Sequence, residues 1–419
     1  MKWQKTGDMA QFGRKMSVGR RDHMKRDSWH MNIRYILAMS LYLCTYSSIV
    51  VFASSYLLEK GFSNSVIGLS FSAVSALVLV TQPAIASMAD KDQGHRIYRI
   101  IQVFLGSSAA AAVGLLTFAK ESVFLLPLFM LVEYCLLTVQ PLLNSLAFLY
   151  ESQGIHVYFG LARGIGSAVY GVSSFLVGGM IKHTGGTGGV PYVYLFANLL
   201  LILVLSHYGR RMARGKTAMQ RVNELPLTMR EFLKKQRRFT LFAIGGIFVY
   251  FAHVIIFNFF IHIVARVGGS ESDVGNAVFL STLLEAFATA AMPWLVKKFG
   301  CRPLLRFSVG MFIVRNIIMY MAPNMGWIYV GSAFQLVSYA LFYPGSILYA
   351  AFVIPETDQV KGQSLIAINY TASSIFANLI GGVAIDRWGI RQALMVGIIL
   401  SCIGAVIVFV SLKKPVQKH

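Results

Sequence analysis

Four ionisable residues lie inside apolar stretches of this sequence, where a full charge is costly. They are Glu133, Arg163, Glu285 and Arg315. An Arg or an acid at the centre of a membrane helix costs about 2.5–3.5 kcal/mol, so such residues normally face the protein interior or an aqueous cavity. Each half of the chain holds one acid and one base, thirty residues apart. We predict that all four serve one central cavity; the structural alternative is an ion pair within each half, Glu133 with Arg163 and Glu285 with Arg315.

The surroundings of Arg163 indicate how such a cavity could bind a solute. Gly160, Gly164 and Gly166 leave one side of the predicted helix without bulk, which allows close packing. Tyr170 follows seven residues later and returns to nearly the same helix face. A guanidinium can hydrogen-bond a hydroxylated ligand, and an aromatic ring can stack on a sugar or base. Arg163 and Tyr170 therefore form a predicted recognition pair.

The elements that must position these residues are membrane helices. Of the 419 residues 56% are hydrophobic and only 13% are charged, against about 25% charged in soluble proteins. Apolar stretches near the length needed to cross a bilayer, about 20 residues, recur along the chain. We predict an all-α integral membrane fold of two pseudo-symmetric six-helix bundles, an arrangement that resembles the major facilitator fold. The twelve expected helices span 33–58, 64–88, 97–118, 123–148, 158–181, 190–208, 239–265, 273–296, 302–323, 327–352, 360–384 and 390–412.

The positive charges fix an expected topology. The net charge is +21, but 30 of the 38 Lys and Arg fall on one predicted side of the membrane and six on the other. This is a positive-inside pattern and not a nucleic-acid footprint, so both termini are expected in the cytoplasm of a multi-pass cell-membrane protein. The expected partners are a small-molecule substrate, protons and membrane lipids, with no nucleic acid, and the protein is expected to be a monomer.

The predicted organisation follows the spacing of these helices. Residues 1–30 form a polar N-terminal tail, which could also reflect a mis-called start. Residues 31–208 form one six-helix bundle, 209–238 a basic cytoplasmic linker, 239–412 the second bundle and 413–419 a cytoplasmic tail. Two bundles of nearly equal length suggest an internal duplication, which is how many secondary transporters are built.

Three segments resemble the lactose permease branch of the major facilitator superfamily, which includes nucleoside and phenylpropionate proton symporters. FGLARGIGSAVY is similar to its fifth-helix segment, which implies that Arg163 binds substrate and that Tyr170 stacks on it. AMPWLVKKFG followed by FIVRNII is similar to its helix 8–9 region, which implies that Arg315 takes part in proton coupling. TQPAIASMADK leads into a stretch similar to its gating loop, which implies gating roles for Asp90, Lys91, Gly94 and Arg96, although Ala86 replaces the usual glycine.

The departures from that branch bear on mechanism. The His and acid expected in the tenth helix are missing, since that region offers Ser338, Tyr339 and Phe342. Glu285 is therefore the first choice for the proton-carrying acid, and Glu133, which is also a candidate for the substrate site, is the second. Further polar residues that could line the cavity, each with a packing role as the alternative, are Asn144, His253, Asn258, Tyr339, Asn369 and Tyr370.

Several classes of function have no motif here. The sequence has no phosphate-binding G-x-x-x-x-G-K-[ST] run, no H-E-x-x-H or G-x-S-x-G motif, and four cysteines without metal spacing. We expect no catalytic site, metal or cofactor.

The predicted function is a secondary active transporter that moves a glycoside, a nucleoside or a small aromatic acid by alternating access, with protons. A proton-driven exporter of drugs or metabolites, sodium coupling and a transporter-like sensor are the alternatives; solute binding that is insensitive to Arg163→Ala would favour the exporter.

Overall fold

The computed structural model describes residues 29–90, 95–118, 123–152, 155–209, 229–355 and 358–412. Within them, twelve helical stretches are long and apolar enough to cross a membrane, which confirms the predicted fold class. The first is Trp29–Glu59, which ends in the short helix α2 (Ala53–Glu59). The other elements are α3 (Asn64–Asp90), α4 (His95–Thr117), α5 (Leu125–Ser152), α6 (Phe159–Thr184), η1 (Thr187–Gly189), α7 (Val190–Gly209), α8 (Met229–Lys235), α9 (Arg237–Asn258), α10 (Phe260–Arg266), α11 (Glu271–Phe299), α12 (Cys301–Met321), α13 (Met325–Ala333), η3 (Phe334–Leu336), α14 (Tyr339–Val353), α15 (Gln359–Trp388) and α16 (Ile390–Ser411).

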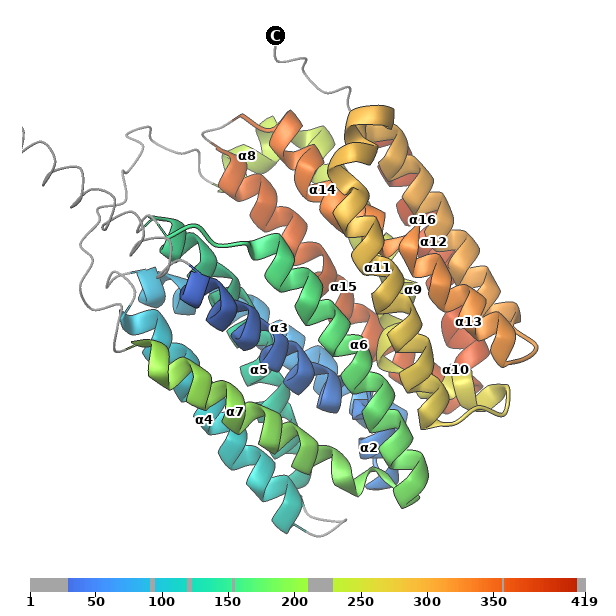
Figure 1. Cartoon of the computed structure of the whole chain (residues 1–419). Helices are drawn as coiled ribbons and strands as arrows, with labels where there is room; N and C mark the ends of the chain where they lie inside the picture. Colours follow the sequence, from blue (N-terminus) through green and yellow to red (C-terminus); the bar gives the residue numbers. More distant parts are fainter. Residues whose placement is uncertain are drawn as a thin grey trace, which may run out of the picture.

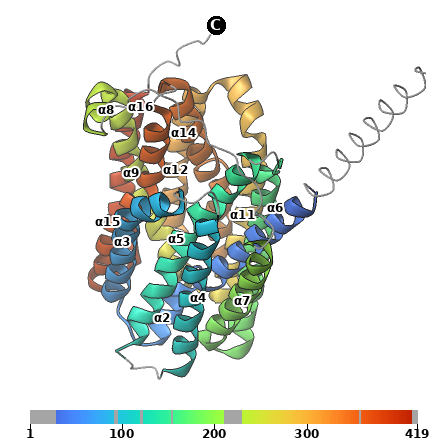
Figure 2. The ribbon, with the colours of Figure 1, turned by 90° about the vertical axis from the view of Figure 1, so that its left-hand side faces the viewer.

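The helices form two halves, one before and one after the linker. In the first half α4 packs against α5 and α7, and in the second α9 packs against α15 and α16. The broadest contacts between the halves are α6 with α11 and α3 with α15, and both pairs lie side by side in Figures 1 and 2. Because a helix satisfies its own backbone hydrogen bonds, this all-helical arrangement is compatible with hydrocarbon.

The halves come closest at the end of the molecule that holds Glu59, Asn64, Glu271 and Trp388, which we call the closed end. A Cβ added to Gly178 of α6 would lie 2.7 Å from the carbonyl oxygen of Glu271 of α11. Glycine therefore permits an approach between these helices that any side chain would prevent.

A second glycine contact joins the other pair of helices at the closed end. A Cβ added to Gly68 of α3 would lie 2.2 Å from the carbonyl oxygen of Asn378 of α15, and one added to Gly382 of α15 would lie 2.3 Å from the carbonyl oxygen of Asn64. The two helices are thus in backbone contact over more than one turn.

Hydrogen bonds between the halves also gather at the closed end. The Asp386 carboxylate of α15 accepts from the backbone N–H groups of Asn64 and Ser65 (3.1 and 2.6 Å) and from the Asn64 amide (2.9 Å). It thereby caps the N-terminus of α3 from the opposite half. The Asn64 amide oxygen also bonds Nε2 of His262 at 2.6 Å. Asp386 therefore stabilises contact between the halves at this end.

Three of the membrane-spanning stretches are interrupted. The first has a turn at Val51 and Phe52, α9 gives way to α10 at Phe259, and the tenth consists of α13, η3 and α14. The expected continuous helices over 33–58, 239–265 and 327–352 are therefore each broken. All three interruptions fall near one pocket, as described below.

Candidate functional site

Arg315 is the centre of the largest buried polar network in the site. It lies on α12 with only 4% of its surface exposed. Its guanidinium donates to Nδ1 of His253 (2.7 Å), to the Gly331 carbonyl (3.3 Å) and to Oε1 of Gln335 (3.2 Å). Because arginine can only donate, Nδ1 of His253 must accept and carries no proton in this arrangement. His253 and Arg315, both predicted site residues, are thus in direct contact.

The break in the tenth span supplies two of these acceptors. The last four carbonyls of an α-helix have no partner within the helix. Gly331 is in the last turn of α13, so its carbonyl is available to Arg315. Gln335 sits in the 3-10 turn η3, from which its side chain also reaches Arg315. A continuous helix would have kept the Gly331 carbonyl for itself.

Gln335 connects Arg315 to Glu285. Its Nε2 donates to Oε2 of Glu285 on α11 at 3.0 Å, while its Oε1 accepts from Arg315. In the described part of the chain no direct ion pair forms between Glu285 and Arg315. Glu285 and Arg315 are therefore linked through the Gln335 amide and not by the direct ion pair of the structural alternative.

Aromatic rings hold His253 in place. The imidazole stacks on the ring of Tyr339 (centroids 4.8 Å apart, planes at 12°), and Tyr339 in turn stacks on Tyr343. The ring of Tyr370 meets the imidazole edge-on at 6.2 Å. Tyr339 and Tyr370 thus lie together around the histidine, as parts of the same polar-aromatic cluster.

A small pocket between the two halves lies beside this network. Val51 and Tyr170 come from the first half, and the other lining residues come from the second. Apolar walls with a few convergent polar groups are typical of small-molecule sites. The lining residues are Val51, Tyr170, Ile256, Phe257, Phe260, Ala277, Val278, Ser281, Thr282, Arg315, Ser332 and Gln335.

The interrupted spans meet at this pocket. Val51 lies at the turn in the first span, Phe257 and Phe260 flank the break between α9 and α10, and Gln335 lies in η3. Discontinuous helices whose freed backbone groups line a site near the membrane midplane are a general feature of transporters. The breaks thus leave backbone polar groups available at the pocket that a regular helix would use in its own hydrogen bonds.

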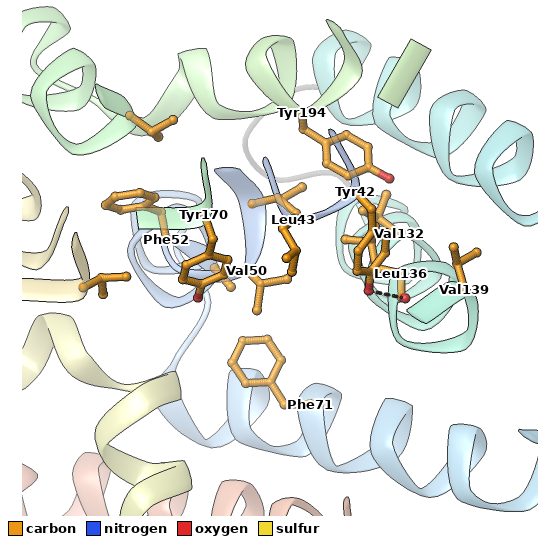
Figure 3. Close-up of a cluster of buried hydrophobic side chains, with 14 of the residues drawn as sticks. Tyr42, Leu43, Val50, Phe52, Phe71, Val132, Leu136, Val139, Tyr170 and Tyr194 are labelled. Carbon is orange, nitrogen blue, oxygen red and sulfur yellow. Dashed lines mark hydrogen bonds between the residues drawn. The ribbon is translucent and has the colours of Figure 1, made fainter. Parts of the chain in front are cut away.

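Tyr170 reaches the pocket from α6. Its ring lies 6.3 Å from that of Tyr46, and Figure 3 shows it beside Val50 and Phe52 of the first span. Figure 3 also shows the Tyr42 hydroxyl bonded to the Leu136 carbonyl, which ties the first span to α5. The residues that fix the position of Tyr170 are therefore apolar or aromatic.

Arg163 and Glu133 are not paired with each other. Arg163 is half-buried and forms no hydrogen bond or ion pair within the described residues, and Oε2 of Glu133 is buried without a hydrogen-bond partner there. The ion-pair alternative for the first half is therefore not what the structure contains.

The remaining predicted residues lie in three different settings. The amide oxygens of Asn144 on α5 and Asn369 on α15 are buried without a partner in the described part of the chain. Asn258 lies instead in the contact between the halves, because its carbonyl accepts from Ser54 of the other half. Within its own half, its side-chain amide donates to Asn378 at 2.6 Å. For the predicted gating loop, Lys91 and Gly94 and the side chains of Asp90 and Arg96 lie outside the described residues.

Gln335 is the functional candidate that sequence reasoning missed. It is a neutral polar residue in an apolar span, and nothing in its spacing links it to Glu285 or Arg315. The available signal was weak: Gly331, Ser332 and Gln335 lie close together, and small and polar residues weaken a helix locally.

Comparisons with known proteins agree with this architecture. The model of the MFS_1 like family matches residues 29–414. The uncharacterized transporter YwbF of Bacillus subtilis (strain 168) is 23% identical over 378 residues, which is 89% of this chain and 91% of that one. A crystal structure of the nucleoside transporter NupG is similar with a TM-score of 0.70 at 13% identity, covering 91% of this chain and 98% of that one. A crystal structure of a D-xylose-proton symporter has a TM-score of 0.64 at 13% identity, covering 91% and 98%.

Proposed function

Because this chain belongs to the MFS_1 like family of the major facilitator superfamily, we propose that it moves a glycoside, a nucleoside or a small aromatic acid by alternating access, in symport with protons. That it is a multi-pass membrane transporter of small solutes follows from the family. The single observation that carries the finer proposal is the pocket between the halves, where Tyr170 faces Arg315 and Gln335. A pocket of this composition can orient a polar solute.

The proposed cycle uses the closed end as one gate. The distribution of Lys and Arg supports a cytoplasmic location for both termini, which would place the closed end on the outer side. Rocking of the halves would separate α3 from α15 and α6 from α11 there. Each proton that enters with the membrane potential contributes about 2.3 kcal/mol per 100 mV.

A vesicle uptake screen tests the proposal. Proteoliposomes with an imposed inward pH gradient should accumulate at least one labelled glycoside, nucleoside or small aromatic acid, and a protonophore should abolish the accumulation. Uptake that follows a sodium gradient and ignores the pH gradient would contradict proton symport while leaving the transporter assignment intact.

Glu285 is the proposed proton carrier because it connects to Arg315 through Gln335. Glu285→Gln should retain exchange of preloaded solute and lose uphill accumulation, since the amide preserves shape but cannot cycle between charged and neutral forms. Exchange and accumulation are measured on the same proteoliposomes.

Glu271→Gln is the matched control for this variant. Glu271 begins the same helix, α11, at the closed end, outside the network, and its variant should accumulate solute as the unmodified protein does. Unaltered accumulation by Glu285→Gln would exclude Glu285 as the coupling residue.

A further inference from the structure

Gln335 is held by two groups of opposite character. Its carbonyl oxygen accepts from the Arg315 guanidinium at 3.2 Å, and its amide nitrogen donates to the Glu285 carboxylate at 3.0 Å. A primary amide thus carries an acceptor oxygen and a donor nitrogen on the same carbon. The protein places the Arg315 guanidinium against the oxygen and the Glu285 carboxylate against the nitrogen. The same donor and acceptor could bind any amide group, including one that belongs to a solute.

Arg315 has hydrogen-bond partners other than Gln335. Arg315 keeps its bonds to His253 and to the Gly331 carbonyl, and His253 is stacked on Tyr339. Glu285 projects from the long helix α11. The donor that holds the amide is therefore positioned by other contacts, and the acceptor is carried by a long helix.

Gln335 itself is the less constrained member of the network. It lies in η3, between the end of α13 at Ala333 and the start of α14 at Tyr339, so its turn is outside the regular α-helical ladder. It is half-buried, and it lines the pocket together with Arg315 and Tyr170. A rotation of its side chain would free Arg315, which also lines the pocket, and Glu285 from this amide.

We propose that the Gln335 amide is an exchangeable bridge, and that the pocket selects solutes with a carboxamide, imide or lactam edge, which take its place between Arg315 and Glu285. This inference rests on the proposed function because it names the substrate class of the same site. The ring of Tyr170, on the opposite wall, would contact the planar group that carries the edge.

The geometry discriminates against close analogues. An N-alkylated lactam has no hydrogen to donate, so the Glu285 carboxylate would lose its partner. A carboxylate would satisfy Arg315 but would place a second negative charge against Glu285. A hydrogen bond to a charged group contributes about 1.5–3 kcal/mol, so either change should weaken binding by about tenfold or more.

The first experiment measures binding to the purified full-length protein by thermal shift. Uridine, whose ring has an N–H between two carbonyls, is compared with N3-methyluridine, and benzamide with N,N-dimethylbenzamide and benzoate. We expect the unblocked member of at least one pair to raise Tm at concentrations at least tenfold lower than its blocked counterpart. Equal effects within both pairs, or no effect of any probe, would overturn the inference.

The second experiment is chemical rescue. Gln335→Ala should lower Tm by removing the bridge, and propionamide should restore part of that loss, whereas N,N-dimethylpropionamide and propionate should not. Gln335→Leu, which fills the space without an amide, is the control and should gain nothing from propionamide. An equal rise of Tm with propionamide in the Ala and Leu variants, or no rise in the Ala variant, would overturn the inference. If Gln335→Ala does not fold, the first experiment on the unmodified protein decides.

Failure of this inference and failure of the proposed function give different results. Solute accumulation in a pH gradient without discrimination between blocked and unblocked amides would leave proton symport standing and remove the amide-edge class. Discrimination in the binding assay with no pH-driven uptake of any solute would preserve the binding site and contradict symport.

Discussion

Arg315→Ala is expected to abolish solute exchange and to destabilise the protein by about 3–5 kcal/mol, the usual result of removing one partner from a buried charged network. The side chain is 4% exposed, and its loss leaves the acceptors on His253, Gly331 and Gln335 without a donor. Arg315→Lys should recover little, because one ammonium group cannot reproduce the planar fork that serves three acceptors.

Thermal unfolding in detergent and solute counterflow in proteoliposomes measure the two effects separately. Arg306→Ala is the matched control, since Arg306 lies on the same helix, donates to the Phe409 carbonyl and packs over the Phe409 ring at 5.5 Å. A cation–π contact at an exposed site contributes about 0.5–1 kcal/mol. Retained stability and exchange in Arg315→Ala would show that the network is neither structural nor functional.

Gly178→Ala is expected to open the closed end. The added Cβ would meet the Glu271 carbonyl at 2.7 Å and the Ser272 Cα at 3.2 Å, which is closer than van der Waals contact allows, so α6 and α11 must separate. The adjacent Gly179 has nothing within 4 Å of an added Cβ. Gly179→Ala therefore makes the same chemical change one residue away without a clash.

A cysteine in place of the fully buried Ser174, on the same interface, reports the opening through its reaction with a membrane-impermeant maleimide. Labelling should be at least tenfold faster with Gly178→Ala than with Gly179→Ala, after subtraction of the signal from the four native cysteines. Equal rates would mean that α6 and α11 accommodate the methyl group without separating.

The contrast between the two pairs of intramembrane charges has a mechanistic consequence. In the second half, Glu285 and Arg315 share a hydrogen-bonded amide. In the first half, Glu133 and Arg163 have no such bridge within the described residues. An unpaired charge is costly in a membrane protein. Arg163 does not line the pocket that contains Tyr170 and Arg315, and its binding of a solute stays a prediction.

The fold was predictable because its cause is local. A run of about 20 apolar residues has to form a helix in a bilayer whatever surrounds it, and the twelve runs and the division into halves follow from that rule. That Arg315 has buried polar partners was also predictable, because a charge in such a run needs a partner. His253 was an even choice between packing and function from sequence, and its contact with Arg315 is a tertiary fact.

What the sequence by itself determined is the set of helices and the charges they carry. Only the tertiary structure decided which charges meet: it placed Gln335 between Glu285 and Arg315, left Glu133 and Arg163 unpaired in the described chain, and put Asn258 in the contact between the halves. The physical reason is that helix formation depends on neighbours along the chain, whereas these contacts depend on where helices break and how closely they approach. The three interrupted spans fix where helices break, and the two glycine contacts at the closed end fix how closely the helices approach.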